Sequence, residues 1–414
     1  MSVLAPKVEI GLDLGDFSSV AFRLDDAVKG VLDNTAYTLG GALFFDITDR
    51  VKSISTSRGK NQALDKIDSG LASIVFDNSD RFFDPNYPNS EFFRFLIPRR
   101  EVRVTSNSFP VFIGFIEDLD FNYSPGNIST VKVDVADGFS TLANAELPEI
   151  APAIEYSGAR ITRILDDPEV EWSPALRQID TGVTQLTDIT IQEGTAALSY
   201  LQLVNQSENG QLFIGREGNL IFQDRDNGLV AKNITFTDDL TPGPQTKIPY
   251  VAVNTVYGSE NLYNRIVLTN NDTFAPETTT QEDFDSQKLF GVRTYTGSGL
   301  LSQNLFDLEA VATQLLATYK EPRYRFESIT VNLDKLTTAE VEDILDLEIG
   351  EVVGVSFTPN QIPPAINNPV RIIAIKHEWT PTQKRVTFSL ENLIYGLFIL
   401  DNSNFGVLDT NSLS

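Results

Sequence analysis

The stretch Arg100–Asp137 reads REVRVTSNSFPVFIGFIEDLDFNYSPGNISTVKVDVAD and predicts three consecutive β-strands separated by polar turns. The same order returns in Gly350–Asn392, where GEVVGV is followed by a gap and then by NPVRIIAIKHEWTPTQKRVTFSLEN. Each stretch has a strand, a loop, a strand that begins with Pro-Val, a polar turn and a strand with alternating Val or Phe. Such alternation can arise in any β-protein, but the stronger interpretation is two related small β-barrel or sandwich units.

Short strand patterns separated by Gly, Pro, Asn and Asp fill most of the remaining chain. The clearest predicted strands are Val8–Leu12, Ser19–Leu24, Ala42–Asp46, Ala72–Asp77, Val102–Ser106, Val111–Leu119 and Thr130–Val135. Helical spacing is best in Asp137–Ala145, Ile161–Asp166, Ala196–Asn205, Phe306–Tyr319 and Thr338–Leu345. Thr337 and Glu340 predict a capped start for the last helix. We therefore expect a β-dominated α+β fold.

Length and proline content predict several domains, because 414 residues are too many for one ordinary core. Pro148 and Pro152 follow the first β-region, and Asp238–Pro249 contains three prolines. The expected domains are an N-terminal β-barrel (1–147), a mixed α/β domain (148–245), an α/β region leading into a C-terminal β-barrel (246–400, with its core at about 325–400), and a mobile tail or arm (401–414).

The composition excludes some kinds of site. The chain has no cysteine, so disulfides and thiolate metal sites are excluded. A signal peptide and a bilayer-spanning segment are not expected, since no basic start precedes an apolar core and no run of about 18 apolar residues occurs. The net charge of −25 opposes a grip on nucleic acid. Such an acidic surface usually serves solubility, although it would also let DNA slide past without sticking.

One block of the chain contains a recognisable sequence motif. Ala197–Arg225, ALSYLQLVNQSENGQLFIGREGNLIFQDR, predicts an amphipathic helix with Leu201 and Val204 inward, followed by a hairpin of strands Gln211–Gly215 and Leu220–Asp224. This helix and hairpin closely resemble part of the hub or minor tail proteins of long-tailed bacteriophages. The positions that carry this resemblance are Glu208, Gly210, Leu212, Phe213, Gly218, Leu220, Phe222 and Arg225.

Other phrases of the same family follow in the same order, between about Phe44 and Asn392. Phe44–Gly59 looks like the family's opening, in which a strand is followed by a Ser-Arg-Gly turn. Val135–Leu147 is similar to the short helix that leaves the family's barrel. Further matching phrases are SGLASIVFDNSDRFFDP (Ser69–Pro85), PRREVRV (Pro98–Val104), SGARITRILDD (Ser157–Asp167) and the terminal HEWTPTQKRVTFSLEN.

The resemblance implies a structural virion protein at the tail tip, assembled in the bacterial host cytoplasm. Such hubs resemble the central hub of contractile-tail baseplates, in which three copies with two barrels each form a pseudo-six-fold ring. The implied partners are further copies of the chain, the distal tail protein, the tape-measure protein and the tip or fibre proteins. DNA would pass through the ring without specific binding. Neither a cofactor nor a resident metal is implied.

A search for reactive groups gives little support to an enzyme. His377 is the only histidine, and no Ser elbow, Walker loop or zinc-protease motif occurs. Carboxylate pairs such as Asp118 with Asp120 are adjacent in sequence, as expected in any acidic protein. Asp77, Asn78 and Asp80 offer oxygen ligands for calcium, but turn capping is the simpler interpretation. We expect no catalytic, cofactor or metal residues.

An aromatic strip gives one candidate contact surface. Phe82, Phe83, Tyr87, Phe92 and Phe93, with Phe95 beside them, lie among prolines and predict a loop anchored on its own core or on another subunit. Two alternatives to a hub remain open. A distal tail protein would form a hexameric ring with one tube-like barrel, and a receptor-binding adhesin would expose aromatic clusters on loops.

Overall fold

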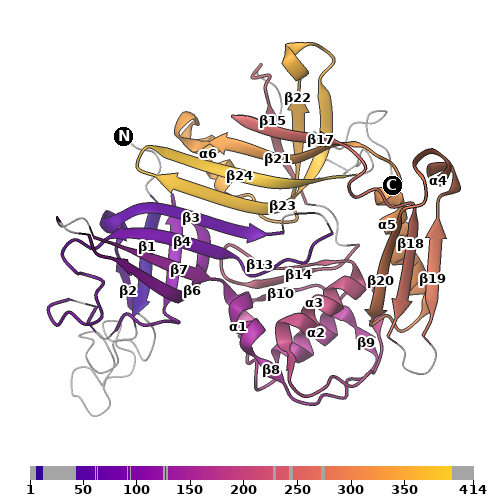
Figure 1. The fold of residues 1–414 in the computed structure, drawn as a ribbon, viewed down its shortest axis with the longest axis horizontal. Coiled ribbons are helices and arrows are strands. Elements are labelled where there is room, and N and C mark those ends of the chain that lie inside the picture. The colour runs from indigo at the N-terminus through magenta and orange to yellow at the C-terminus, as the bar shows by residue number, and fades with distance from the viewer. Residues whose placement is uncertain are drawn as a thin grey trace. The chain divides into compact units, whose positions relative to one another are not determined.

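The computed structural model describes residues 6–12 and 43–393, apart from 61, 63, 91, 94, 125, 127–128, 227–229, 242–245 and 272–275 (Figure 1). The predicted strand Ser19–Leu24 and the predicted tail Asp401–Ser414 lie outside the described residues. The chain divides into two compact units. Unit 1 comprises Met1–Thr56, Leu71–Asp137 and His377–Lys384, and unit 2 comprises Ser57–Gly70, Gly138–Lys376 and Arg385–Ser414.

Unit 1 is built on one sheet, in which alternate side chains are buried. Val8, Ile10, Ile74, Phe76 and Val133 are fully enclosed in its core. The strand order is β2-β1-β5-β6-β7-β4-β3. The bounds are β1 Pro6–Leu12, β2 Leu43–Asp46, β3 Val51–Gly59, β4 Leu71–Asp77, β5 Glu101–Ser106, β6 Phe109–Asn122 and β7 Thr130–Ala136, with a short 3-10 helix η2 at Thr48–Arg50.

Unit 2 contains a sheet with the same connectivity. Its order is β16-β15-β22-β23-β24-β21-β17. If the seven strands of each sheet are numbered along the chain, both sheets have the order 2-1-5-6-7-4-3. The tip of the β23–β24 hairpin belongs to unit 1. The bounds are β15 Ala231–Thr237, β16 Thr246–Pro249, β17 Ala252–Tyr257, β21 Tyr324–Asn332, β22 Val352–Phe357, β23 Ile366–Thr380 and β24 Gln383–Asn392.

The repeat predicted from sequence is confirmed as a repeat of strand order. Arg100–Asp137 forms the antiparallel meander β5-β6-β7, and Gly350–Asn392 forms the meander β22-β23-β24. One difference lies in the first strand, because β1 runs antiparallel to β5 whereas β15 runs parallel to β22. The second strand differs in the same way, since β1 and β2 are antiparallel while β15 and β16 are parallel. The expected domain limits and the closure of the sheets into barrels stay predictions.

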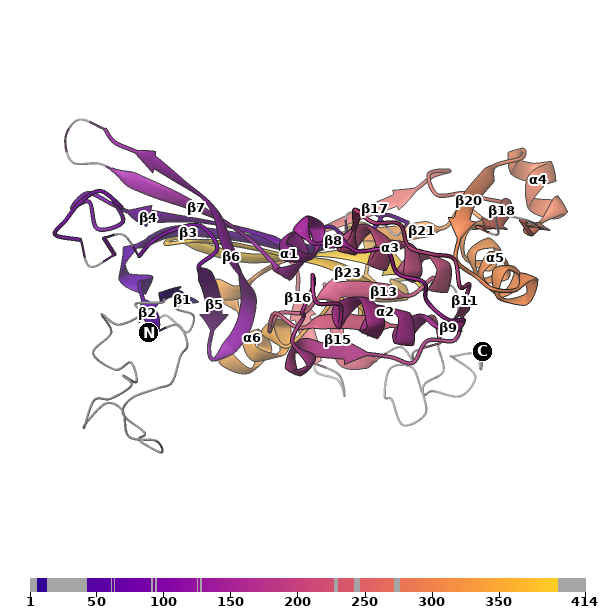
Figure 2. The same ribbon diagram turned by 90° about the horizontal axis from the view of Figure 1, so that it is seen from below.

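A mixed segment precedes β15 and packs around one apolar cluster, which includes Phe139, Ile161, Leu201, Val204 and Phe222. Figures 1 and 2 show its three helices beside the β13–β14 hairpin. The elements are α1 Gly138–Asn144, β8 Glu146–Leu147, β9 Glu155–Tyr156, α2 Ser157–Leu165, η3 Pro174–Leu176, β10 Arg177–Ile179, β11 Gln185–Leu186, β12 Thr195–Ala196, α3 Ala197–Glu208, β13 Gln211–Ile214 and β14 Leu220–Gln223.

A second segment lies between β17 and β21 and has its own small core, formed by Ile266, Leu268, Leu300, Leu308 and Val311 among others. It contains β18 Arg265–Asn270, β19 Thr278–Glu282, α4 Phe284–Phe290, β20 Thr294–Leu300 and α5 Leu305–Tyr319. After β21 follow η4 Leu333–Lys335 and α6 Thr338–Leu345, and η5 Pro359–Gln361 precedes β23.

The β-dominated α+β class and the five predicted helices are confirmed, with shifts of a few residues at their ends. Thr337 and Glu340 form the predicted capping box at α6. The helix α4 was not predicted, because Phe284 and Leu289 are exposed and leave no inward apolar pattern. Within the described residues, no helix has the length and apolar character needed to cross a membrane.

Candidate functional site

The block Ala197–Arg225 forms the predicted helix and hairpin. Leu201 and Val204 are fully buried on α3, and Phe213 and Phe222 on the two hairpin strands enter the core. The helix ends at Asn209, whose left-handed backbone (φ 57°) lets its N–H bond back to the last turn. Leu212, Leu220 and Phe222 lie in one apolar cluster with Leu201 and Val204 and therefore hold the helix against the hairpin.

Two motif glycines allow close backbone packing in this block. At Gly218 the hairpin turn needs a positive φ of 79°, which favours glycine. At Gly210 a Cβ atom would lie 2.4 Å from the carbonyl oxygen of Gln223 on the opposite strand. A side chain at Gly210 would therefore displace the hairpin, and a side chain at Gly218 would be strained by the positive φ.

We expect Gly210→Ala to lower the free energy of unfolding of unit 2 by about 1–3 kcal/mol, because the new methyl group meets backbone that cannot rotate away. Urea unfolding followed by the fluorescence of Trp172 measures this, in a Trp379→Phe background that leaves one tryptophan. Gly258→Ala is the matched control, since its Cβ would meet only Val256 at 3.8 Å. Equal losses in both variants would show that the close approach at Gly210 is not the cause.

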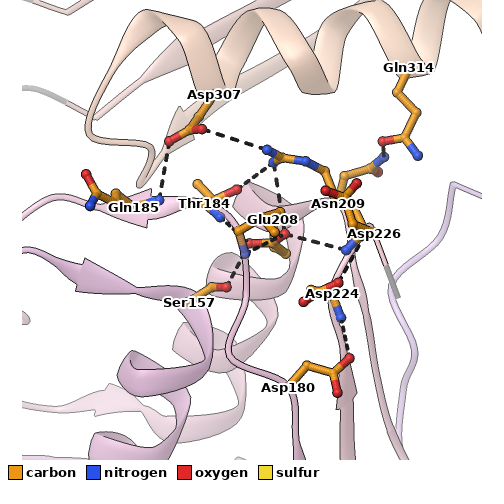
Figure 3. A network of polar contacts seen from close by, with 12 residues as sticks. Ser157, Asp180, Thr184, Gln185, Glu208, Asn209, Asp224, Asp226, Asp307 and Gln314 are labelled. Carbon is orange, nitrogen blue, oxygen red and sulfur yellow. Dashed lines mark hydrogen bonds and ion pairs between the residues drawn. The ribbon is translucent and has the colours of Figure 1, made fainter. Parts of the chain in front are cut away.

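Glu208 is the polar centre of the block (Figure 3). Its side chain is fully buried, and Oε2 accepts hydrogen bonds from the Ser157 hydroxyl (2.7 Å) and the Thr184 amide (2.9 Å). Oε1 lies 4.0 Å from the Arg225 guanidinium. A carboxylate enclosed in this way is stable only because donors surround it.

Arg225 links this carboxylate to a distant helix. Its guanidinium donates to the Thr184 hydroxyl (2.6 Å) and lies 3.7 Å from the Asp307 carboxylate in the first turn of α5. Asp307 in turn accepts a bond from the Gln185 amide (3.3 Å). Of the six predicted motif residues, the network joins Glu208 and Arg225, whereas Gly210, Phe213, Gly218 and Phe222 belong to the packing and turn of the hairpin. The network connects α3, the end of the hairpin, the loop before β11 and α5.

The sequence did not indicate Ser157, Thr184 or Asp307 as members of the network. Ser157 lies within the quoted phrase SGARITRILDD, but nothing in it shows which residue meets Glu208. The groups of this network are bonded to one another, so the arrangement suits rigidity and offers no open nucleophile or base.

A second buried ionic cluster surrounds Glu155. Its carboxylate receives bonds from Arg163 and from Arg160, and Arg160 is fully buried. The hydrogen bond from Arg163 and then that from Arg160 outweigh the effect of burial and hold the pKa of Glu155 below its ordinary value of 4.5.

A depressed folded-state pKa makes the Glu155 contribution pH-dependent. Its stabilisation is present above the unfolded pKa of about 4.5 and is lost as pH falls through the lower folded pKa. We therefore expect the urea concentration at the unfolding midpoint of unit 2 to decrease as the pH is lowered below about 4.5. In Glu155→Gln this decrease should be smaller over the same pH interval. Midpoints at pH 7, 5, 4 and 3.5 measure the two slopes, and identical slopes would contradict the assignment.

The predicted Ser-Arg-Gly turn is wrong, because Ser57, Arg58 and Gly59 form the end of β3. Arg58 is buried and donates to Glu348 (2.8 Å) and to the Ile214 carbonyl (3.3 Å). The phrase therefore belongs to the end of a strand and not to a turn.

The aromatic strip lies in unit 1. Phe83 and Phe92 are enclosed in its core, where Phe83 contacts Phe76 with ring centroids 4.9 Å apart. Phe82, Tyr87 and Phe93 are half-buried, and the guanidinium of Arg50 lies 3.8 Å from the ring centroid of Phe82. The loop is therefore anchored on its own unit through Phe83 and Phe92, while subunit contact stays a prediction.

The candidate calcium ligands and His377 make turn, ion-pair and core contacts. Asp77 accepts from Ser79, Asn78 accepts from the Phe83 amide, and Asp80 pairs with Arg50. These are turn and ion-pair contacts, and the described ranges contain no group of three acidic or histidine side chains placed to hold a metal ion. His377 is buried, with Nδ1 3.1 Å from the Thr56 hydroxyl and its ring edge-on to Trp379.

Unit 2 also contains a cleft of about 770 Å³. It lies between α5, the open end of the β13–β14 hairpin and the end of β24. Its wall includes Gln211, Gln223, Phe306, Tyr319 and Leu393. No sequence pattern indicates this cleft, because its wall combines residues that are far apart in sequence, from Lys60 to Leu393.

No protein-family model matches the sequence, and no curated protein matches it. Among solved structures, the chain is similar to the tail protein from Neisseria meningitidis MC58, with a TM-score of 0.58 and 12% identity over 94% of this chain and 96% of that chain. The 43 kDa tail protein of prophage MuSo2 from Shewanella oneidensis gives 0.56 and 11% over 84% and 95%. Prophage tail protein gp18 from Listeria monocytogenes EGD-e gives 0.50 and 13% over 92% and 94%. The chain therefore has the fold of phage tail proteins, in agreement with the resemblance of its sequence motifs.

Proposed function

We propose that this chain is the hub of a phage tail tip, a non-catalytic subunit that forms a trimeric ring at the end of the tail tube. The observation that carries the proposal is the seven-strand order that occurs twice in one chain. Three chains would present six similar sheets, so the ring could meet a six-fold tube on one side and three-fold tip proteins on the other.

The fold and the buried networks support this role. The similar structures are tail proteins, and each covers most of this chain. The charged groups of three buried side chains, Glu208, Arg225 and Arg160, form hydrogen bonds within the chain, which suits a rigid structural role. The expected neighbours are the distal tail protein, the tape-measure protein and the tip or fibre proteins.

Imaging of intact virions labelled with gold-conjugated antibody against this chain tests the proposal. We expect label at the tail tip, on three-fold density next to the last six-fold ring. Label on a six-fold ring would identify a distal tail protein, and label on side fibres an adhesin. Absence from the virion would overturn all three assignments.

The net charge of −25 suits a wall past which DNA moves with little adhesion. Asp118 and Asp120 lie exposed on β6 and give a starting point. If they face the channel, Asp118→Asn with Asp120→Asn should slow DNA release from otherwise normal virions, most strongly at low salt. The matched control neutralises Asp285, an exposed carboxylate on α4. Unchanged release would exclude these two residues from the channel wall.

A further inference from the structure

The outer edge of β3, the last strand of the unit 1 sheet, is filled by β23 of the same chain. In unit 1, Nδ1 of His377 lies 3.1 Å from the Thr56 hydroxyl. In unit 2, the Lys60 amide donates to the Ile373 carbonyl (3.0 Å). Residue numbers rise along β3 as they fall along β23, so the two strands run antiparallel.

The strand of unit 2 that corresponds to β3 has an open edge. This strand is β17, and within the described residues it pairs only with β21. Val251, just before it, and Tyr257, at its end, are 48% and 70% exposed. The stretch Val251–Tyr257 reads VAVNTVY and carries no charge, although charged side chains commonly protect an edge from pairing. The edge therefore suits a further strand.

The strand of unit 1 that corresponds to β23 also has an open edge. This strand is β6. Phe115 of β6 and Arg371 of β23 are equivalent, since each pairs with the first residue of the strand before it. Six residues farther along, Phe121 therefore corresponds to His377. From Asp118 to Asn122, β6 pairs only with β7 in the part of the chain that the structure describes.

Side chains on the same face of the two hairpins differ in burial. His377 and Trp379 are buried, with ring centroids 5.2 Å apart. The equivalent rings of Phe121 and Tyr123 stack at 6.2 Å, but Phe121 is only half-buried and Tyr123 is 53% exposed. The Tyr123 hydroxyl donates to Asp84 (3.2 Å), which leaves the ring itself open. The β6 hairpin thus has the aromatic face of a docked hairpin without its cover.

We propose that Asp118–Asn122 of one copy pairs antiparallel with β17 of a second copy, in the way that β23 pairs with β3 within one chain. Thr56 lies three residues before the end of β3, as Asn254 does in β17. Asn254 would therefore lie opposite Phe121 of the second copy, which corresponds to His377. The inference rests on the proposed trimeric ring and names the strands that would join its copies.

Charge and symmetry favour this pairing. Two Asp118–Asn122 segments would place the carboxylates of Asp118 and Asp120 against like charges, whereas β17 has no charged side chain. The contact joins two different surfaces of the chain, so each copy can bind one neighbour on each side. Such a heterologous contact closes into a ring when the rotation allows it.

Cysteine pairs test the contact in the purified full-length chain, which has no cysteine of its own. The test pair is Phe121→Cys with Asn254→Cys, treated with a short thiol crosslinker and analysed by mass. The negative control replaces the second position by Phe284→Cys, an exposed site on α4. We expect at least about 10-fold more intermolecular product for the test pair. Thr56→Cys with His377→Cys is the positive control and should give intramolecular product.

The products separate the contact from the proposed function. Species of three chains would support both, and a ladder of growing length would support the contact but contradict the trimeric ring. Intermolecular product no greater than in the negative control, or intramolecular product from the test pair, would overturn the contact and leave the tail-tip assignment to the virion images. Product from Asn254→Cys alone would show that β17 pairs with itself, which overturns the contact as well.

A second measurement covers the case in which the Phe121 variant misfolds. Tyr257 is exposed and, three positions beyond Asn254, would lie opposite Asp118 of the second copy. Tyr257→Asp should therefore weaken self-association about 5-fold relative to Tyr257→Lys, as measured by sedimentation at low salt. Equal association of the two variants, or no self-association of the unchanged chain, would overturn the contact.

Discussion

Replacement of Arg160 by alanine is expected to lower the free energy of unfolding of unit 2 by about 3–5 kcal/mol. The guanidinium is fully buried and donates to Glu155 (2.6 Å), the Tyr200 hydroxyl (2.7 Å) and the carbonyls of Ala153 and Thr187 (both 2.8 Å). Alanine would leave these four acceptors without their donor in the interior of unit 2. Urea unfolding at pH 7, followed through Trp172, measures the loss.

The matched control is Arg163→Ala. Arg163 binds the same Glu155 carboxylate, but its side chain is 44% exposed, so water can replace it and the loss should stay below about 1 kcal/mol. If the two variants lose the same amount, burial of Arg160 does not determine its contribution. Arg160→Lys should recover only part of the stability, because an ammonium group cannot reach four partners with the planar geometry of a guanidinium.

Replacement of Glu208 by alanine is expected to have an effect of similar size, about 3–5 kcal/mol. It removes the acceptor of the Ser157 hydroxyl and the Thr184 amide and leaves Arg225 with a weaker counter-charge. The change should also reach α5, because Arg225 lies between Glu208 and Asp307.

Hydrogen exchange distinguishes a network from a local contact. We expect faster exchange in Glu208→Ala at the Thr184 amide and at the first turn of α5, beyond what the loss of global stability explains. Glu309→Ala, an exposed change on α5, should alter neither by more than about 0.5 kcal/mol. Faster exchange at Thr184 but not at α5 would limit the network to the helix and hairpin.

Local patterns predicted much of this fold correctly. Alternation of Val, Ile and Phe identified the strands of both meanders, because one face of each strand is buried. Thr337 and Glu340 identified the start of α6, since a capping box needs only residues three apart. The block Ala197–Arg225 was predictable for the same reason, as its helix, turn and hairpin are continuous in sequence.

Contacts between distant parts of the chain were not predictable. Glu208 meets Ser157, which is 51 residues away, and α5 joins the network from still farther along the chain. Nor does any pattern show that β15 runs parallel to β22, because the apolar pattern of a short strand does not depend on the direction in which the strand runs. The cleft was missed for a related reason, since its walls become neighbours only after the sheets form.

The segment between β17 and β21 has a consequence for how such a chain can change. Tyr257 and Tyr324, which border it, face each other across an antiparallel ladder, so its two ends leave the sheet at neighbouring points. In unit 1 the equivalent strands, β3 and β4, are joined by a connection of only eleven residues between Gly59 and Leu71. We therefore expect this position to accept modules of very different length without a change in the register of the sheet. Relatives with the same sheets could carry different modules at this point, and an engineer could graft a foreign domain there.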